Sequence, residues 1–318
     1  MFLPILLLVV GIAVLILGAE ALVRGASSAA KKWGISTIVI GLTVVSFGTS
    51  APELFVNLIS AYKGSTDLAI ANVVGSNLAN ILLILGIGAV IIPLKVKEGT
   101  TFREIPFAFL AILLVVILGN DMFLDGAYST VNVLSRSDGI AFVAFFIIFL
   151  FYTYGLTKIQ GEHEHIDTYS WTTSVVMFLA GLLALAFGGK LIVDNAIILA
   201  HLAGMSEALI GLTIVALGTS LPELATTIVA VRKGHTDLAI GNAVGSNIFN
   251  VFWILGLTAV IKPLEFDTQA NIDTFYTVFA TFLLFLFMFV GDKHKLSRLQ
   301  GILFIVLYIA YIGYAVVR

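Results

Sequence analysis

Two long stretches of the chain are near copies of one another. Ser36 to Leu94 aligns with Ser206 to Leu264 without a gap, at a constant offset of 170 residues, and more than half of the aligned positions are identical. Weaker similarity continues upstream, where Gly11 and Gly18 align with Gly181 and Gly188 at the same offset. The repeating unit is therefore about half of the chain, which is far too long for a solenoid of short repeats.

The composition indicates that these repeats fold in a membrane. Hydrophobic residues make up 59% of the chain and charged residues 11%, whereas soluble domains carry roughly a quarter charged residues. The apolar runs are continuous rather than alternating, which argues against a membrane β-barrel. Ten runs reach or approach the length of about 20 residues that a membrane-spanning helix needs. We therefore predict an all-α integral membrane protein with spans near 2–23, 36–62, 67–92, 105–120, 138–156, 172–193, 206–231, 237–261, 273–291 and 299–317.

The distribution of basic residues predicts the topology. If the N-terminus lies outside, only five of the 17 basic residues fall on the outer side: Lys63, Arg136, Lys190, Lys262 and Arg318. The positive-inside rule then places both termini outside a cell membrane. Because five helices precede the second repeat, the two repeats have inverted orientations, which is common in secondary transporters.

We thus predict three parts of the chain: a first five-helix repeat at 1–156, a central loop at 157–171, and a second, inverted five-helix repeat at 172–318. The copied motifs occupy 36–94 and 206–264. The first apolar segment lacks a basic n-region, so it is expected to stay as a helix rather than be cleaved as a signal. The loops are short, so we expect no soluble catalytic domain between the helices.

Each repeat carries one acidic residue inside an apolar span. Glu53 and Glu223 occupy matching positions, and a carboxylate in a membrane is costly unless it faces a cavity or a partner. Neither Lys nor Arg lies near them in their own helices, but hydroxyl and amide side chains do: Thr49, Ser50, Ser76 and Asn80 in the first repeat, and Thr219, Ser220, Ser246 and Asn250 in the second. Such oxygen ligands suit Na⁺, Ca²⁺ or Mg²⁺ rather than Zn²⁺ or Cu.

A proline precedes each of these glutamates. In the sequences GTSAPE and GTSLPE, Pro52 and Pro222 cannot continue the helical hydrogen bonding and clash with the carbonyls of Gly48 and Gly218. We therefore predict that helices 2 and 7 are broken near those glycines. Broken helices at membrane depth are tolerated where they line an ion site.

The doubled GTSxPE motif, each copy followed by a helix with the GSNxxN pattern, resembles the α-repeats of the cation/Ca²⁺ exchanger superfamily, and most closely the prokaryotic Na⁺/Ca²⁺ exchangers. The resemblance covers essentially the whole chain. It implies ion coordination by Thr49, Ser50, Glu53, Ser76 and Asn80, by Thr219, Ser220, Glu223, Ser246 and Asn250, and by the backbone carbonyls of Ser46 and Ala216. It further implies that helices 1 and 6 slide to alternate access to the site.

The resemblance implies a Na⁺/Ca²⁺ antiporter that works as a monomer in the lipid bilayer, without a cofactor, an enzymatic activity or a nucleic-acid partner. Relatives with proton coupling place an acid where Asn80 and Asn250 stand, so a H⁺/Ca²⁺ antiporter is the alternative and a passive cation channel is a weaker one. Relatives that need K⁺ resemble this pattern but carry Asp at the position of Asn250.

Two further charge pairs occupy matching repeat positions with their signs exchanged. Glu20 and Arg24 are four residues apart, and Lys190 and Asp194 align with them in the second repeat. This spacing predicts ion pairs within each helix at the membrane surface, rather than groups that carry ions.

Overall fold

The computed structural model describes residues 2–124, 131–157, 167–205 and 216–317. In the first half the helices, π-helical segments and short strands are α1 (Phe2–Trp33), α2 (Thr37–Ile40), η1 (Gly41–Val45), α3 (Ser46–Thr49), α4 (Ala51–Lys63), α5 (Thr66–Leu78), η2 (Ala79–Leu85), α6 (Gly86–Ile91), β1 (Leu94–Lys95), α7 (Glu98–Phe102), α8 (Glu104–Leu118), α9 (Asp121–Leu124), β2 (Val133–Leu134) and α10 (Arg136–Leu156). The second half contains α11 (Trp171–Leu202), α13 (Ala216–Gly218), α14 (Leu221–Arg232), α15 (Thr236–Ile248), η5 (Phe249–Leu255), α16 (Gly256–Ile261), β3 (Leu264–Glu265), α17 (Thr268–Phe287), β4 (Lys295–Leu296) and α18 (Arg298–Val317).

The helices confirm a multi-pass membrane architecture. Within the described residues, eight helical spans are long and apolar enough to cross a membrane, and the bent pair Thr37–Thr49 and Ala51–Lys63 raises the number to nine. The predicted span at 206–231 falls partly outside the described residues, and its described part is α13 and α14. The central loop predicted at 157–171 also lies mostly outside them.

Two predicted spans are too short. The first was expected to end near residue 23, but α1 continues to Trp33, and α11 continues to Leu202 instead of ending near residue 193. The extension of α1 is rich in small residues that are buried, among them Ala26, Ser27 and Ser28. Packing on a neighbouring helix therefore stabilises a segment whose own composition is only weakly apolar.

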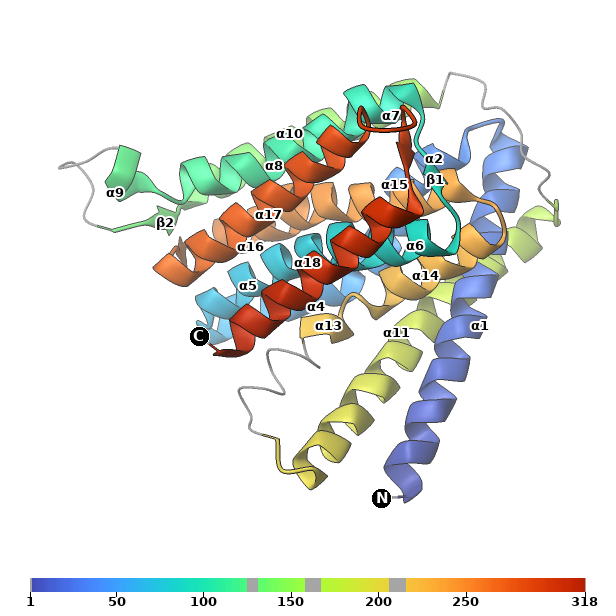
Figure 1. Ribbon diagram of the computed structural model, residues 1–318, viewed down its shortest axis with the longest axis horizontal. Helices are drawn as coiled ribbons and strands as arrows, with labels where there is room; N and C mark the ends of the chain where they lie inside the picture. The colour runs from blue at the N-terminus through green and yellow to red at the C-terminus, as the bar shows by residue number, and fades with distance from the viewer. Residues whose placement is uncertain (1, 125–130, 158–166, 206–215, 318) are drawn as a thin grey trace.

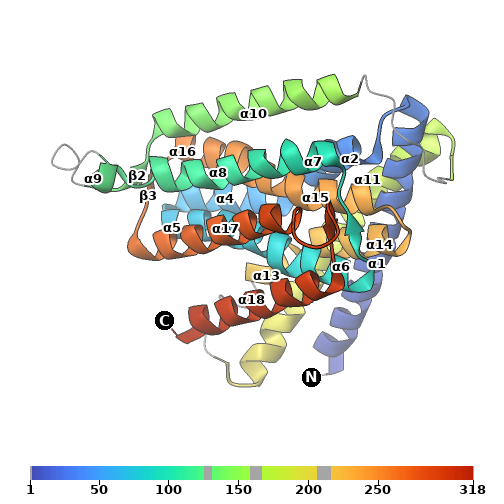
Figure 2. The same ribbon diagram turned by 45° about the horizontal axis from the view of Figure 1, so that its top comes forward.

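The helices α1 and α11 form an antiparallel pair that leans away from the remaining helices (Figures 1 and 2). Glycines allow their backbones to meet: a methyl group on Gly11 would lie 3.1 Å from the Gly188 carbonyl oxygen, and one on Gly18 would lie 3.0 Å from that of Gly181. Along the pair, the residue number rises in one helix as it falls in the other. The sequence offset matched Gly11 with Gly181, so equivalent glycines are not the ones in contact.

The remaining helices surround two continuous helical rods, α5–η2–α6 and α15–η5–α16. Each rod has a π-helical segment at the same position of the repeat, η2 and η5, whose bounds are again 170 residues apart. These π-helical segments were not predicted from the sequence. The rods are the most buried spans, with 72% and 78% of their most apolar windows inside the structure.

Two short antiparallel ladders tie the connections at opposite ends of the bundle (Figure 1). Strand β1 pairs with β4, and β2 pairs with β3, with Leu94 opposite Leu296 and Leu134 opposite Leu264. All four of these leucines are buried. The ladders therefore fasten connections of one half of the chain to connections of the other half.

Candidate functional site

The helix break predicted from the prolines is present in both repeats. In the first, α3 ends at Thr49 and α4 begins at Ala51, with a bend of 45° between the two parts of the span. The residues at the breaks, Ser50 and Ser220, share nearly the same backbone angles, φ −84° and ψ 8° against φ −85° and ψ 2°. The break lies two residues after the predicted glycine. A bend there relieves the clash of the proline ring while Ser50 N–H still donates to the Ser46 carbonyl at 3.0 Å.

The two glutamates lie in the first turns of the helices that follow the breaks. Glu53 belongs to α4 and Glu223 to α14, and their exposed fractions are 0% and 1%. The free N–H groups of a helix start favour negative charge nearby. Each carboxylate is thus held at the positive end of a short helix deep inside the protein.

Hydroxyl groups from both repeats surround the carboxylates. Ser50 of the first repeat donates to Glu223 Oε1 of the second at 3.0 Å, and Ser246 reaches the same oxygen at 3.5 Å. Ser76 donates to Glu53 Oε1 at 3.4 Å, and Ser220 donates to the Ser76 hydroxyl at 3.2 Å. The two acids therefore belong to one polar centre built across the repeats.

Four buried oxygens at this centre have no hydrogen-bond donor. They are Oε2 of Glu53, Oε2 of Glu223, Oδ1 of Asn80 and Oδ1 of Asn250, and they form two pairs at matching repeat positions. A buried acceptor left without a donor costs about 1–3 kcal/mol. Bound cations would supply the partners that these oxygens lack, and two carboxylates with neutral oxygens are the donor set that hard cations such as Ca²⁺ and Na⁺ take.

The described residues contain no cluster of three His, Cys, Asp or Glu side chains that could hold a metal ion. The donor set at the centre consists instead of two acids, hydroxyls and amides. This set disfavours the transition metals, which prefer thiolate and imidazole ligands.

Four asparagines that were not predicted from the sequence contact residues of this centre. Thr49 donates to Asn242 Oδ1 at 3.1 Å, and Thr219 donates to Asn72 Oδ1 at 3.4 Å. A further pair, Asn77 and Asn247, links the two buried rods: each donates its amide to the other's backbone carbonyl. All four recur at the 170-residue offset, which is the signal that could have identified them.

The structure brings the predicted side chains together from four places in the chain. Thr49, Ser50 and Glu53 lie at the α3–α4 break, Ser76 and Asn80 on α5 and η2, Thr219, Ser220 and Glu223 at the α13–α14 break, and Ser246 and Asn250 on α15 and η5. The Ser46 hydroxyl donates to the Gly41 carbonyl at 2.6 Å, and Ala216 begins α13. The ligand roles of all twelve residues stay a prediction.

The charge pairs predicted within α1 and α11 are confirmed. Arg24 Nη2 lies 2.6 Å from Glu20 Oε1, and Lys190 Nζ lies 2.8 Å from Asp194 Oδ2. Glu20 makes a further contact that the sequence did not predict, because Lys233 Nζ also lies 2.6 Å from its Oε1. Lys233 follows the end of α14, so this contact joins α1 to the second broken helix.

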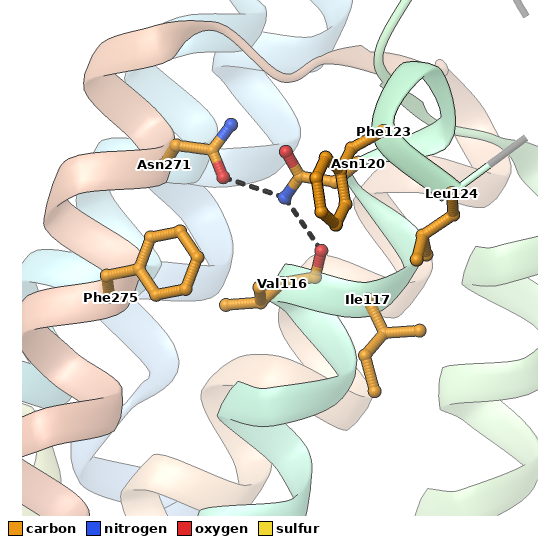
Figure 3. A pocket seen from close by; sticks show the side chains of 7 residues that line it. All are labelled: Val116, Ile117, Asn120, Phe123, Leu124, Asn271 and Phe275. Carbon is orange, nitrogen blue, oxygen red and sulfur yellow. Dashed lines mark hydrogen bonds between the residues drawn. The ribbon is translucent and has the colours of Figure 1, made fainter. Parts of the chain in front are cut away.

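A cavity of about 480 Å³ lies between α8, α9 and α17, away from the carboxylates (Figure 3). It is lined by Val116, Ile117, Asn120, Phe123, Leu124, Asn271 and Phe275. The Asn120 amide donates to Asn271 Oδ1 and to the Val116 carbonyl, each at 2.7 Å. The lining carries no charge, so this cavity is not the cation site.

Comparison with known proteins agrees with this geometry. The chain matches the family described as "Sodium/calcium exchanger protein" over residues 3–155 and 173–317. It is 30% identical to "Sodium/calcium exchanger MaX1" of Methanosarcina acetivorans, over 96% of this chain and 97% of that protein. It is 38% identical to "Inner membrane protein YrbG" of Escherichia coli, over 85% of this chain and 83% of that protein. A structure of the sodium-calcium exchanger NCX_Mj soaked with 10 mM Na⁺ and zero Ca²⁺ superposes with a TM-score of 0.85, 30% identity and 98% coverage of each chain.

Proposed function

This chain belongs to the sodium/calcium exchanger protein family, and from that premise we propose that it exchanges Na⁺ for Ca²⁺ at a single centre around Glu53 and Glu223. Proteins of this family are antiporters and not enzymes, so the two ions are transported substrates and no cofactor is needed. The two ions compete for the same oxygens. The bound ion is then carried across by alternating access.

The observation that supports this centre most strongly is the set of four buried oxygens without donors. Two of them are carboxylate oxygens and two are amide oxygens. The centre therefore has enough acceptors, and what it lacks is positive charge. One Ca²⁺ neutralises two ionised glutamates. The proposed ligands are the twelve residues described above, from Ser46 and Ala216 to Asn80 and Asn250.

Charge also explains why the protein exchanges ions rather than leaking them. An empty centre carries two buried negative charges, and a buried unpaired charge is costly to move through a membrane. Loading with one Ca²⁺ cancels the two negative charges, and loading with several Na⁺ leaves neither carboxylate unpaired. Only the loaded states therefore switch between the two sides, and the flux of one ion depends on the other.

We propose that the switch uses the whole ten-helix architecture. The two five-helix repeats, 1–156 and 172–318, are related by inversion, and the span at 206–231, the seventh in chain order, brings the number of helices to ten. The pair α1 and α11 slides against the other helices, which hold the centre. Both termini lie outside the cell membrane, and one chain suffices for transport.

Coupling to Na⁺ rather than H⁺ is supported by two amide residues among the proposed ligands. Asn80 and Asn250 carry neutral amides, which cannot relay protons, and their oxygens are two of the four without donors. An amide at Asn250 also leaves the centre with two carboxylates instead of the three found in K⁺-dependent relatives. Proton coupling is the alternative that the experiment must exclude.

The test is uptake of ⁴⁵Ca²⁺ into proteoliposomes. We expect uptake when the liposomes contain Na⁺, and none when they contain choline with an imposed pH gradient. Uptake driven by the pH gradient alone would establish proton coupling. Uptake that requires neither gradient would identify a channel and overturn the proposal.

Electrogenic exchange is a second expectation. If three Na⁺ leave for each Ca²⁺ that enters, one net positive charge moves outward per cycle, worth about 2.3 kcal/mol per 100 mV. A membrane potential that is positive inside, set with K⁺ and valinomycin, should therefore accelerate ⁴⁵Ca²⁺ uptake. Uptake that does not respond to the potential would show that exchange is electroneutral.

A further inference from the structure

Asn77 and Asn247 lie where the two buried rods contact each other. Asn77 Nδ2 donates to the Asn247 carbonyl oxygen at 3.2 Å, and Asn247 Nδ2 donates to the Asn77 carbonyl oxygen at 3.3 Å. Both residues are buried. Each amide N–H₂ group is thus fixed on the backbone of the opposite repeat, which determines where its Oδ1 points.

Those two Oδ1 atoms each accept a hydrogen bond from a residue of the proposed ion site. Asn80 Nδ2 donates to Asn247 Oδ1 at 2.9 Å, and Asn250 Nδ2 donates to Asn77 Oδ1 at 3.0 Å. The contacts in the two repeats are therefore the same. In one set, Asn247 bonds to the Asn77 carbonyl through its N–H₂ group and to the Asn80 amide through its oxygen. In the other, Asn77 bonds in the same way to the Asn247 carbonyl and the Asn250 amide.

This arrangement settles which end of the Asn80 and Asn250 amides is free. An asparagine amide has an oxygen end that attracts a cation and an N–H₂ end that repels one, and the two ends have nearly the same shape. The N–H₂ end of each is engaged by Asn247 or Asn77. The oxygen end of each is left buried and without a donor, ready for a cation.

We propose that Asn77 and Asn247 are positioning residues that hold the amide oxygens of Asn80 and Asn250 toward the transported cation. The inference rests on the proposed function of the same centre. Each positioning residue acts on a ligand of the other repeat, so the site is complete only when the two rods are in register. Hydrogen-bond partners of metal ligands commonly act in this way.

The test is Ca²⁺ binding to the purified full-length protein in detergent, in Na⁺-free buffer, by isothermal titration calorimetry. We expect Asn247→Leu to weaken Ca²⁺ binding about 10- to 100-fold, the range typical for loss of such a partner. The matched control is Ile248→Ala, which truncates the adjacent, fully buried residue of the same helix. The control should lower thermal stability and leave the affinity unchanged. Equal affinities of Asn247→Leu and the wild type would overturn the proposal.

A double-mutant cycle separates positioning from a structural role. If Asn247 acts through Asn80, Asn247→Leu should add nothing to the loss caused by Asn80→Ala, because the oriented oxygen is already gone. Losses that multiply would show that Asn247 acts independently of Asn80 and would contradict the proposal.

A second variant serves if Asn247→Leu does not fold. In Asn247→Asp the carboxylate still accepts from the Asn80 amide but cannot donate to the Asn77 carbonyl. We expect an affinity within about fivefold of the wild type, a difference of about 1 kcal/mol. An affinity as low as the range given for the leucine variant would show that the link between the rods matters, and not the orientation of Asn80.

Glu53→Gln in the same assay distinguishes a failure of the positioning role from a failure of the ion site. If Glu53→Gln abolishes binding and Asn247→Leu does not affect it, the positioning role fails while the site stands. If Glu53→Gln binds Ca²⁺ like the wild type, the site itself fails and the positioning role fails with it.

Discussion

The buried rods and the α1–α11 pair are built in opposite ways. The rods α5–α6 and α15–α16 have 72% and 78% of their most apolar windows buried, whereas the corresponding values for α1 and α11 are 22% each. The rods meet through asparagine amides, as between Asn77 and Asn247. The pair meets through glycine backbones, as between Gly11 and Gly188.

This difference matches the roles proposed above, with ion selectivity assigned to the rods and motion to the α1–α11 pair. Directional hydrogen bonds between the rods fix the positions of oxygen ligands, and buried networks of this kind resist displacement. Close backbone contact between α1 and α11 makes these two helices a unit, while most of their surface is not buried inside the protein. If the pair slides as proposed above, its close contact lets it move as one body past a centre that keeps its geometry.

The largest expected effect concerns the carboxylates between the rods. Glu53→Gln and Glu223→Gln each remove one of two negative charges, and we expect Ca²⁺ transport to fall by about 100-fold or more, equivalent to about 2.7 kcal/mol. The measurement is Na⁺-dependent ⁴⁵Ca²⁺ uptake in proteoliposomes. A variant with normal uptake would contradict the site assignment.

Glu104→Gln is the matched control for these variants. Glu104 is also a buried acid, 3% exposed, but it lies at the start of α8 and its Oε1 accepts a hydrogen bond from Tyr152. We expect this variant to transport Ca²⁺ at close to the normal rate. A loss as large as that of Glu53→Gln would mean that removing any buried acid disables the protein.

The second expected effect concerns the contact between α1 and α11. A methyl group on Gly188 would lie 2.8 Å from Leu15 N and 2.9 Å from the Gly11 carbonyl oxygen. Gly188→Ala should therefore force the pair apart and cost about 1–3 kcal/mol, as overpacking usually does. The measurement is the midpoint of thermal unfolding in detergent, together with ⁴⁵Ca²⁺ uptake.

The adjacent glycine provides the control for that variant. A methyl group on Gly189 would meet no atom within 4 Å, and alanine favours a helix over glycine by about 1 kcal/mol. Gly189→Ala should then be neutral or slightly stabilising. If the two alanine variants lose the same stability, close backbone contact does not hold the pair together.

The membrane spans, the two helix breaks and the two central glutamates could be predicted from the sequence. The apolar runs predicted where most spans lie, and Pro52 and Pro222 predicted the two breaks, because a proline in a helix interior has a local effect that depends little on the surroundings. The duplication indicated that Glu53 and Glu223 are functional, since an acid in an apolar span is costly and yet occurs at the same position of both repeats.

The contacts between repeats could not be predicted in the same way. An alignment matches equivalent residues, but Ser50 bonds to Glu223 and not to its own equivalent Ser220. The end of α1 was also missed, because Ala26, Ser27 and Ser28 form a helix through packing on α11 rather than through their own apolar character. Such contacts depend on how the two halves dock, which no local pattern records.

A smaller effect is expected where α1 meets the second broken helix. Glu20 Oε1 lies 2.6 Å from Lys233 Nζ, and the carboxylate is about one third exposed. If α1 must leave this contact when it slides, Glu20→Gln should raise the exchange rate by up to about fivefold, which corresponds to the 1 kcal/mol upper range of exposed pairs. A reduced rate at full stability would show that the contact does not restrain α1. The measurement is the initial rate of ⁴⁵Ca²⁺ uptake at saturating internal Na⁺.

The smallest effect is expected at the matching charge pair of α11. Lys190 and Asp194 lie on the same helix, so their ion pair does not connect one helix to another. Their side chains are 73% and 50% exposed, so water screens the interaction. Asp194→Asn should change the stability by at most about 0.5 kcal/mol and leave the exchange rate unchanged. Thermal unfolding and ⁴⁵Ca²⁺ uptake measure both quantities. If Asp194→Asn accelerates exchange as much as Glu20→Gln, the effect of Glu20 comes from surface charge in general, and the contact with Lys233 has no special role in holding α1.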